Sequence, residues 1–239
     1  GDPNKKKWVL MQGDGKYSIG TFNGTEFKEE LGRFSCDVGP NFYATQTWAN
    51  TETGDGRRIQ AAWMRGGAYP DMTFNQQASF PCELTLRTTP AGPRIFREPV
   101  REIANIHGKE TTWANRAITE NSPLTLAPSG DLFHVKLNVD IPEGSTLTLD
   151  IRGVPLVLTH NTVACGTAPQ PVHGALKSIE VLIDRTSIEV FANGGEISLS
   201  RCYLPGREGL TLKATGGVAT VKSASLFPLK SIWPTNPPK

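Results

Sequence analysis

The sequence lacks long apolar runs and has almost no charge bias. In 239 residues, no apolar stretch reaches the roughly 18 residues of a membrane-spanning helix, so no membrane partner is expected. The 25 basic and 23 acidic residues leave a net charge of +2. A nucleic-acid-binding protein needs a basic stripe, so this near-balance argues against a nucleic-acid partner.

Motifs for metal and serine chemistry are also missing. There is no C-x-x-C and no G-x-S-x-G, and the four histidines stand in scattered contexts, so neither a metal, a cofactor nor a Ser-His-Asp triad is expected. His134 falls on the polar face of a predicted strand and is expected to be exposed. An even number of cysteines permits disulfides without requiring them. We expect free, partly buried thiols at Cys36, Cys82, Cys165 and Cys202.

Helical patterns are scarce. The one candidate is 97–107, where Val100, Ile103 and Ile106 have roughly helical spacing, and at most one short turn of helix is predicted there. By contrast, 24 glycines and 18 prolines are spread along the whole chain between short apolar segments. Such spacing is typical of many short strands, so the chain is predicted to be all-β.

The first part reads as two meanders, which are the unit of a β-propeller blade. Tight turns at 13–15 and at Asn23-Gly24 separate the strands of the first meander, and the long loop 65–81 interrupts the second. The predicted strands are 8–11, 17–22 and 26–28, followed by 42–48, 58–64, 83–87 and 94–97.

After about residue 110 the alternation of apolar and polar residues becomes cleaner. One buried and one wet face per strand is typical of an antiparallel β-sandwich. The expected organisation is therefore a propeller part at 1–106 and a sandwich at 107–239, with a loosely ordered tail at 233–239. The clearest alternating positions are Phe133, Val135, Leu137, Val139 and Ile141, then Leu147, Leu149 and Ile151, and then Ile179, Val181 and Ile183.

Two segments, 41–48 and 62–67, place aromatic residues beside Gln and Arg at strand ends. Such a set suits a sugar, because ring faces stack on C–H patches while polar groups bond hydroxyls. The alternative is that Trp48 and Trp63 are core residues between two blades.

Five segments of the chain carry a resemblance to a known family: 41–47, 56–59, 63–66, 80–87 and 183–195. Together they extend, in order, over nearly the whole chain. The chain resembles glycoside hydrolase family 32, which includes levanases, inulinases and invertases, and segment 63–67 is most similar to the levanase-like branch. The resemblance implies the last blades of a partial five-bladed β-propeller, a trailing β-sandwich and a retaining mechanism with two carboxylates.

The three acidic motifs of that family are not found. These are an aspartate nucleophile in W-M-N-D-P-N-G, an aspartate in R-D-P, and a glutamate acid/base in E-C. Asp2-Pro3-Asn4 lacks the preceding Trp-Met-Asn and has Lys5 in place of Gly, and Cys82-Glu83 reverses the E-C order. No catalytic residue is therefore assigned. The chain is expected to begin after the acid/base, to be the C-terminal portion of a β-fructosidase, and to be inactive alone.

The resemblance assigns Trp63 and Tyr43 to the wall of the fructose pocket, with Gln46, Trp48 and Arg65 as weaker candidates. The expected ligand is a fructan or fructo-oligosaccharide. The resemblance also implies a secreted or periplasmic protein, although no leader is visible. Asp184 and Glu189, in segment 183–195, are expected to be polar partners on a strand and turn.

Two other interpretations stay open. The chain could be a non-catalytic carbohydrate-binding module or a structural β-sandwich, because fold alone does not decide function. Half a propeller also exposes strand edges, which predicts either self-association or pairing with a missing N-terminal half.

Overall fold

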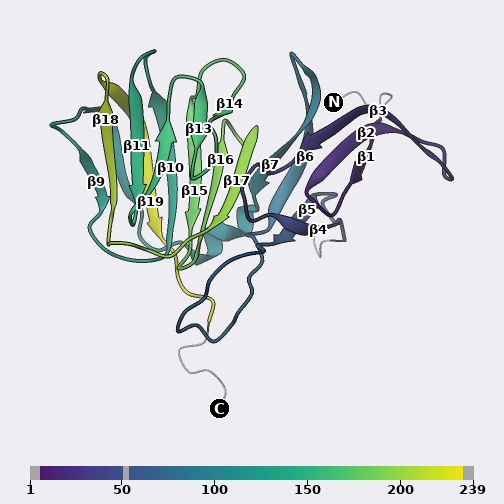
Figure 1. Ribbon diagram of the computed structural model, residues 1–239, viewed down its shortest axis with the longest axis horizontal. Coiled ribbons are helices and arrows are strands. Elements are labelled where there is room, and N and C mark those ends of the chain that lie inside the picture. The colour runs from purple at the N-terminus through teal and green to yellow at the C-terminus, as the bar shows by residue number, and fades with distance from the viewer. Residues whose placement is uncertain (1–5, 51–53, 234–239) are drawn as a thin grey trace.

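The computed structural model describes residues 6–50 and 54–233, and the interpretation of Asp2-Pro3-Asn4 lies outside these ranges. Of the tail 233–239, only Trp233 is described. The described residues form four antiparallel sheets and one short 3-10 helix, which confirms the all-β prediction (Figure 1).

The first sheet is a three-stranded meander of order β1-β2-β3. Its third strand is longer than the predicted 26–28, because the ladder with the second strand continues until Ser35 stands opposite Lys16. The strand bounds are Trp8–Met11 for β1, Lys16–Phe22 for β2 and Phe27–Ser35 for β3.

The second sheet has four strands in the order β4-β5-β6-β7, close to the predicted boundaries. It packs on the first sheet through a small apolar core that includes Tyr17, Ile19 and Ala62. The 3-10 helix η1, Arg101–Ile106, follows inside the candidate segment 97–107 and is longer than the single turn predicted there. The strand bounds are Tyr43–Trp48 for β4, Arg58–Trp63 for β5, Cys82–Thr89 for β6 and Gly92–Pro99 for β7.

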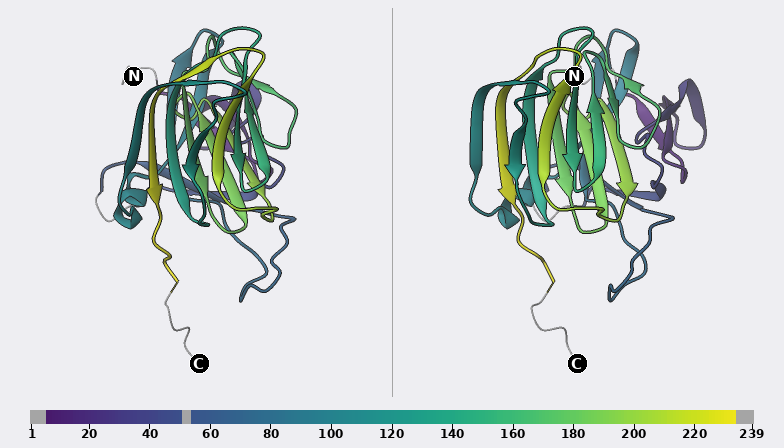
Figure 2. Two further views of the ribbon diagram at one scale, coloured as in Figure 1. Left: turned by 90° about the vertical axis from the view of Figure 1, so that its left-hand side faces the viewer. Right: turned by 60° about the vertical axis from the view of Figure 1, so that its left-hand side comes forward.

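The remaining strands form a β-sandwich of two six-stranded sheets (Figures 1 and 2). The first sheet has the order β17-β16-β15-β10-β19-β8, with bounds Ile197–Cys202, Ser187–Ala192, Ser178–Ile183, Phe133–Asp140, Ala219–Pro228 and Thr111–Ile118. The second has the order β14-β13-β12-β11-β18-β9, with bounds Gln170–Pro171, Thr162–Ala164, Val154–Leu158, Thr146–Ile151, Leu210–Thr215 and Leu124–Ala127. Alternating apolar residues of both sheets meet in one large core, as the sequence pattern predicted.

Two features of the sandwich differ from the sequence-based expectation. His134 was predicted to be exposed, and this is wrong: it is 2% exposed, because His107 and Phe227 cover it and Glu180 accepts its hydrogen bond. Strand β16 is buried on both faces instead of one. Its outer face packs against the first part of the chain, where Phe191 joins a cluster with Cys82.

All four cysteines are free thiols, three of them buried and Cys202 partly buried, which confirms that prediction. Within the ranges that the structure describes, no helix has the length and apolar character needed to cross a membrane. In the same ranges, no three histidine, cysteine or acidic side chains converge on a point where a metal ion could be held.

Candidate functional site

A β-bulge in β4 arranges the predicted site residues on one face. Tyr43 pairs with Trp63 and Gln46 pairs with Ala61, so one extra residue lies on the β4 side between the two pairs. Ala44 takes up this residue with a φ of 47°, in the left-handed region. Residues directly opposite each other share a face, so the bulge turns Tyr43 and Gln46 to the same side of the sheet.

Tyr43, Trp63 and Arg65 form a compact cluster at the end of these strands. The Tyr43 and Trp63 rings meet edge to face, with centroids 6.2 Å apart and planes at 61°. The Arg65 guanidinium carbon lies 4.5 Å from the centroid of the Tyr43 ring. Tyr43 is 39% exposed and Trp63 37% exposed, so both rings offer apolar surface to a ligand.

Beside this cluster lies an open hollow of about 410 Å³ lined by Gln46, Trp63 and Gln76 together with alanines and Gln77. The indole N–H of Trp63 donates to Gln76 Oε1 at 2.5 Å, which fixes the ring against the hollow. An aromatic ring flanked by amides can stack on a sugar and bond its hydroxyls. Among the described residues that line the hollow there is no carboxylate, and its ring and amides are groups suited to binding.

Trp48 stands apart from the other four predicted residues. It pairs with Ile59, four residues along β5 from Trp63, which corresponds to about 13 Å along a strand. Trp48 is 41% exposed, so the alternative that Trp48 and Trp63 are core residues does not describe these side chains. The structure therefore brings together Tyr43, Trp63, Arg65 and Gln46, and leaves Trp48 outside.

Contacts with the sandwich anchor both ends of the site. Asn41, just before β4, accepts from the Cys202 backbone N–H at 2.8 Å and donates to the Arg65 carbonyl at 2.7 Å. On the other side, Thr186 Oγ1 donates to Gln77 Oε1 at 2.5 Å. The sandwich strands thus hold the segments that carry Arg65 and the hollow.

Behind the site, a buried ionic network joins the two parts of the chain. Arg97 on β7 is fully buried and contacts Asp37 at 3.2 Å, Glu189 at 3.5 Å and Ser198 Oγ at 2.7 Å. Asp37 accepts from the Ser200 backbone N–H at 3.0 Å and from its hydroxyl at 2.8 Å. Burial raises the pKa of Glu189 to about 7, although the Arg97 guanidinium opposes this. Glu189 is thus a structural group, as the sequence suggested, but in an interior position.

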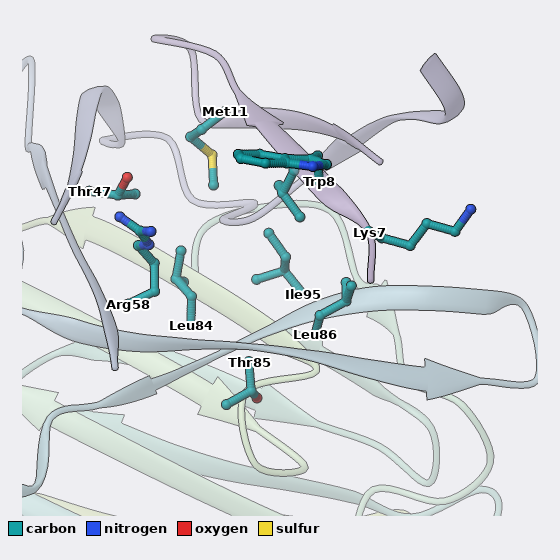
Figure 3. Close-up of a pocket in the computed structure, with 10 residues that line it drawn as sticks. Lys7, Trp8, Met11, Thr47, Arg58, Leu84, Thr85, Leu86 and Ile95 are labelled. Atoms are coloured by element: carbon teal, nitrogen blue, oxygen red, sulfur yellow. The ribbon is translucent and has the colours of Figure 1, made fainter. Parts of the chain in front are cut away.

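A separate pocket of about 430 Å³ lies between the first two sheets (Figure 3). The side chains of Arg58 and Trp8 face into it, above the apolar Leu84 and Ile95 (Figure 3). None of the predicted site residues lines it. The other lining residues are Lys7, Val9, Met11, Thr47, Thr85 and Leu86.

Gln76 and Gln77 line the hollow but were not predicted from the sequence as site residues. They lie in the long loop 65–81, which carries no recognisable motif, and they reach the hollow only because the loop folds back on β5. Trp63 bridges to Ala78, and the Met64 N–H donates to the Gln77 carbonyl at 3.0 Å. The length of the loop was the one available signal, since long loops in compact folds are often functional.

An aromatic wall with amide and guanidinium partners, set beside a β-sandwich, has the chemical groups needed to stack on a sugar ring and bond its hydroxyls. Two family models match the chain. Residues 6–99 match the N-terminal domain of glycosyl hydrolases family 32, and residues 152–228 match the C-terminal domain of the same family. The chain belongs to glycoside hydrolase family 32.

Several relatives are similar over almost the whole chain. The levanase of Bacillus subtilis (strain 168) is 30% identical over 99% of this chain and 42% of its own length. The extracellular exo-inulinase of Aspergillus awamori is 22% identical over 96% of this chain and 53% of its own length. The crystal structure of the exo-inulinase from that organism superposes with a TM-score of 0.78 at 20% identity, covering 98% of this chain and 55% of that chain.

The β-fructofuranosidase of Schwanniomyces occidentalis, solved with fructosyl-erythritol, superposes with a TM-score of 0.73 at 15% identity, over 96% of this chain and 58% of that chain. The chain therefore spans about half the length of these relatives.

Proposed function

We propose that this chain forms one wall of the fructose-binding site of a retaining β-fructosidase that acts on levan- or inulin-type fructans. The observation that carries the proposal is the exposed Tyr43–Trp63–Arg65 cluster beside the hollow that Gln46 lines. The similarity to a levanase and an exo-inulinase supports fructans as the substrate class.

The proposed division of labour follows the two parts of the chain. Residues 1–106 would belong to the last blades of a five-bladed β-propeller, and residues 107–239 to the trailing β-sandwich. The two meanders β1–β3 and β4–β7 support this assignment. The three acidic motifs do not occur in the 239 residues, and no carboxylate is found among the described residues that line the hollow. We therefore expect no hydrolysis of a glycosidic bond by this chain alone.

Calorimetric titration with fructo-oligosaccharides of levan and inulin type tests the binding site. We expect Trp63→Ala to weaken binding by a factor of about 2 to 10, the worth of one aromatic contact. Trp48→Ala, a matched loss of an exposed indole on the same sheet, should leave the affinity unchanged. Equal effects of the two substitutions, or no heat with any fructan, would contradict the proposal.

Hydrolysis assays on levan, inulin and sucrose test the second claim. No turnover is expected from this chain, and clear turnover would overturn the assignment of the chemistry to other residues. A purely binding role is the second candidate, favoured because the described lining of the hollow consists of alanine, glutamine and tryptophan side chains. It predicts specific binding without any activity, even when a complementary propeller half is supplied.

Partners and location are proposed on the same basis. Strands β1 and β4 are the end strands of their sheets, and open edges favour pairing with a propeller half or a second copy of this chain. Light scattering checks this, and a clean monomer with a cooperative melt would argue against it. A secreted or periplasmic location is supported by the extracellular exo-inulinase among the relatives.

A further inference from the structure

The orientation of Trp63 depends on the stem of loop 65–81. Gln76, which accepts the indole N–H at 2.5 Å, belongs to this stem. The stem is held to the end of β5 by backbone hydrogen bonds, from Met64 to the Gln77 carbonyl at 3.0 Å and from Ser79 to the Ala62 carbonyl at 2.8 Å. A movement of the loop would therefore reach the Trp63 ring.

The outer part of the loop is organised around two aromatic rings. Tyr69 and Phe74 pack with ring centroids 5.5 Å apart, and the Met72 N–H donates to the Tyr69 carbonyl at 3.3 Å. The Tyr69 hydroxyl donates to the Met64 carbonyl at 3.5 Å, and burial raises the pKa of Tyr69 to about 12. Phe74 is only two residues from Gln76, so the ring cluster and the stem are directly connected.

The chain segment after β19 reaches this cluster from the other end of the sequence. Trp233 stacks on Phe74 with centroids 5.8 Å apart and planes within 4° of parallel. The segment is fixed upstream, where the Lys230 N–H donates to the Ile106 carbonyl at 2.8 Å and the Leu229 N–H to the Leu132 carbonyl at 3.0 Å. The loop and this segment project from the same end of the molecule (Figures 1 and 2).

We propose that Trp233 is a positioning residue: segment 229–233 holds loop 65–81 through the Phe74 stack and thereby sets, through Gln76, the orientation of the Trp63 ring. Ring stacking on one side restricts the loop without covering the hollow, whose lining does not include Trp233. The consequence for sugar affinity rests on the proposed function, whereas the effect on the loop and on Trp63 does not.

Trp233→Ala tests this, with Trp233→Phe as the conservative variant and Ile232→Ala as the matched control, since Ile232 is 80% exposed and adjacent. The readouts are hydrogen exchange of the loop amides, the Trp63 indole N–H resonance assigned with Trp63→Phe, and calorimetric affinity for a fructo-oligosaccharide. For Trp233→Ala we expect loop exchange to rise and affinity to fall, each by a factor of about 2 to 10, with a shifted indole resonance.

Trp233→Phe should keep most of the wild-type behaviour because a ring still covers Phe74, and Ile232→Ala should keep all of it. Unchanged loop exchange and an unchanged Trp63 resonance in Trp233→Ala would overturn the proposal, as would faster loop exchange without a shift at Trp63. Wild-type protein that binds no fructo-oligosaccharide would contradict the proposed function instead, and exchange and resonance would still decide the role of Trp233.

Discussion

Glu189 makes the junction between the two parts of the chain sensitive to pH. It is fully buried on β16, and its Oε1 accepts the Phe80 backbone N–H at 2.7 Å. One guanidinium, that of Arg97, faces two buried carboxylates, Glu189 and Asp37. With both carboxylates ionised the network carries one uncompensated negative charge, which is costly in a buried position.

Burial therefore raises the pKa of Glu189 from 4.5 to about 7 in the folded protein. Between these values the folded state holds a proton that the unfolded state has released, so the free energy of unfolding falls as pH rises. The slope is about 1.4 kcal/mol per pH unit, and the total loss is on the order of 3 kcal/mol between pH 4.5 and 7. The contribution of the protonated Glu189 to the free energy of unfolding is fully present below pH 4.5 and is lost above about pH 7.

Glu189→Gln removes this titration while keeping the shape of the side chain. Urea denaturation from pH 4 to 8 would measure the free energy of unfolding of both proteins. We expect the difference in the free energy of unfolding, wild type minus variant, to decline by on the order of 3 kcal/mol between pH 4.5 and 7. Above pH 7 this difference should stay constant.

Glu83→Gln, a substitution of a partly exposed glutamate on β6 that lies 3.9 Å from Arg57, is the control and should leave the wild-type slope unchanged. A difference between wild type and Glu189→Gln that stays constant with pH would refute the reasoning. So would a difference that grows with pH.

Three further predictions concern other parts of the chain. Leu149→Ala should lower the free energy of unfolding by about 2 to 5 kcal/mol in urea denaturation, because Leu149 is 0% exposed in the sandwich core. Ala44→Gly should raise it by up to about 1 kcal/mol, since glycine adopts the positive φ of the bulge without strain. Burial alone would raise the pKa of Glu180, but the hydrogen bond with His134 and the charge of Lys136 lower it overall. This stabilisation is present above pH 4.5 and lost as pH falls, so Glu180→Gln should destabilise the protein at pH 7 and flatten its acid unfolding curve.

Local patterns predicted the strands because each depends on nearby residues. Alternation in segments such as 133–141, and turn residues such as Asn23-Gly24, were enough to place most strands within a few residues. Alternation predicted which face of a strand is buried only where the other face is exposed to solvent. Ser187 and Glu189 look solvent-facing by alternation, yet another part of the chain covers them.

The residues that come together in the candidate site were only partly predictable from the sequence. Tyr43 and Gln46 differ by an odd number of positions and should face opposite sides of a regular strand. The bulge at Ala44 reverses this, and alanine gives no local sign of it, because positive φ is ordinarily a glycine or asparagine conformation. Gln76 and Trp233 depend on how a long loop and a distant segment fold back, which neither composition nor spacing encodes.

The contacts between the two parts bear on whether the sandwich is an independent binding module. Three hydrogen bonds cross from the first part of the chain to the sandwich: Asn41 to the Cys202 backbone, Gln77 to Thr186, and Phe80 to Glu189. The sandwich therefore holds the segments before, within and after the aromatic wall. An excised sandwich would expose the outer face of β16, including a carboxylate now paired with a buried guanidinium. Its own outer surface would lack the Tyr43–Trp63 pair, which lies on β4 and β5. The sandwich therefore holds the segments that carry the candidate site, and the proposed sugar binding would require the two parts together.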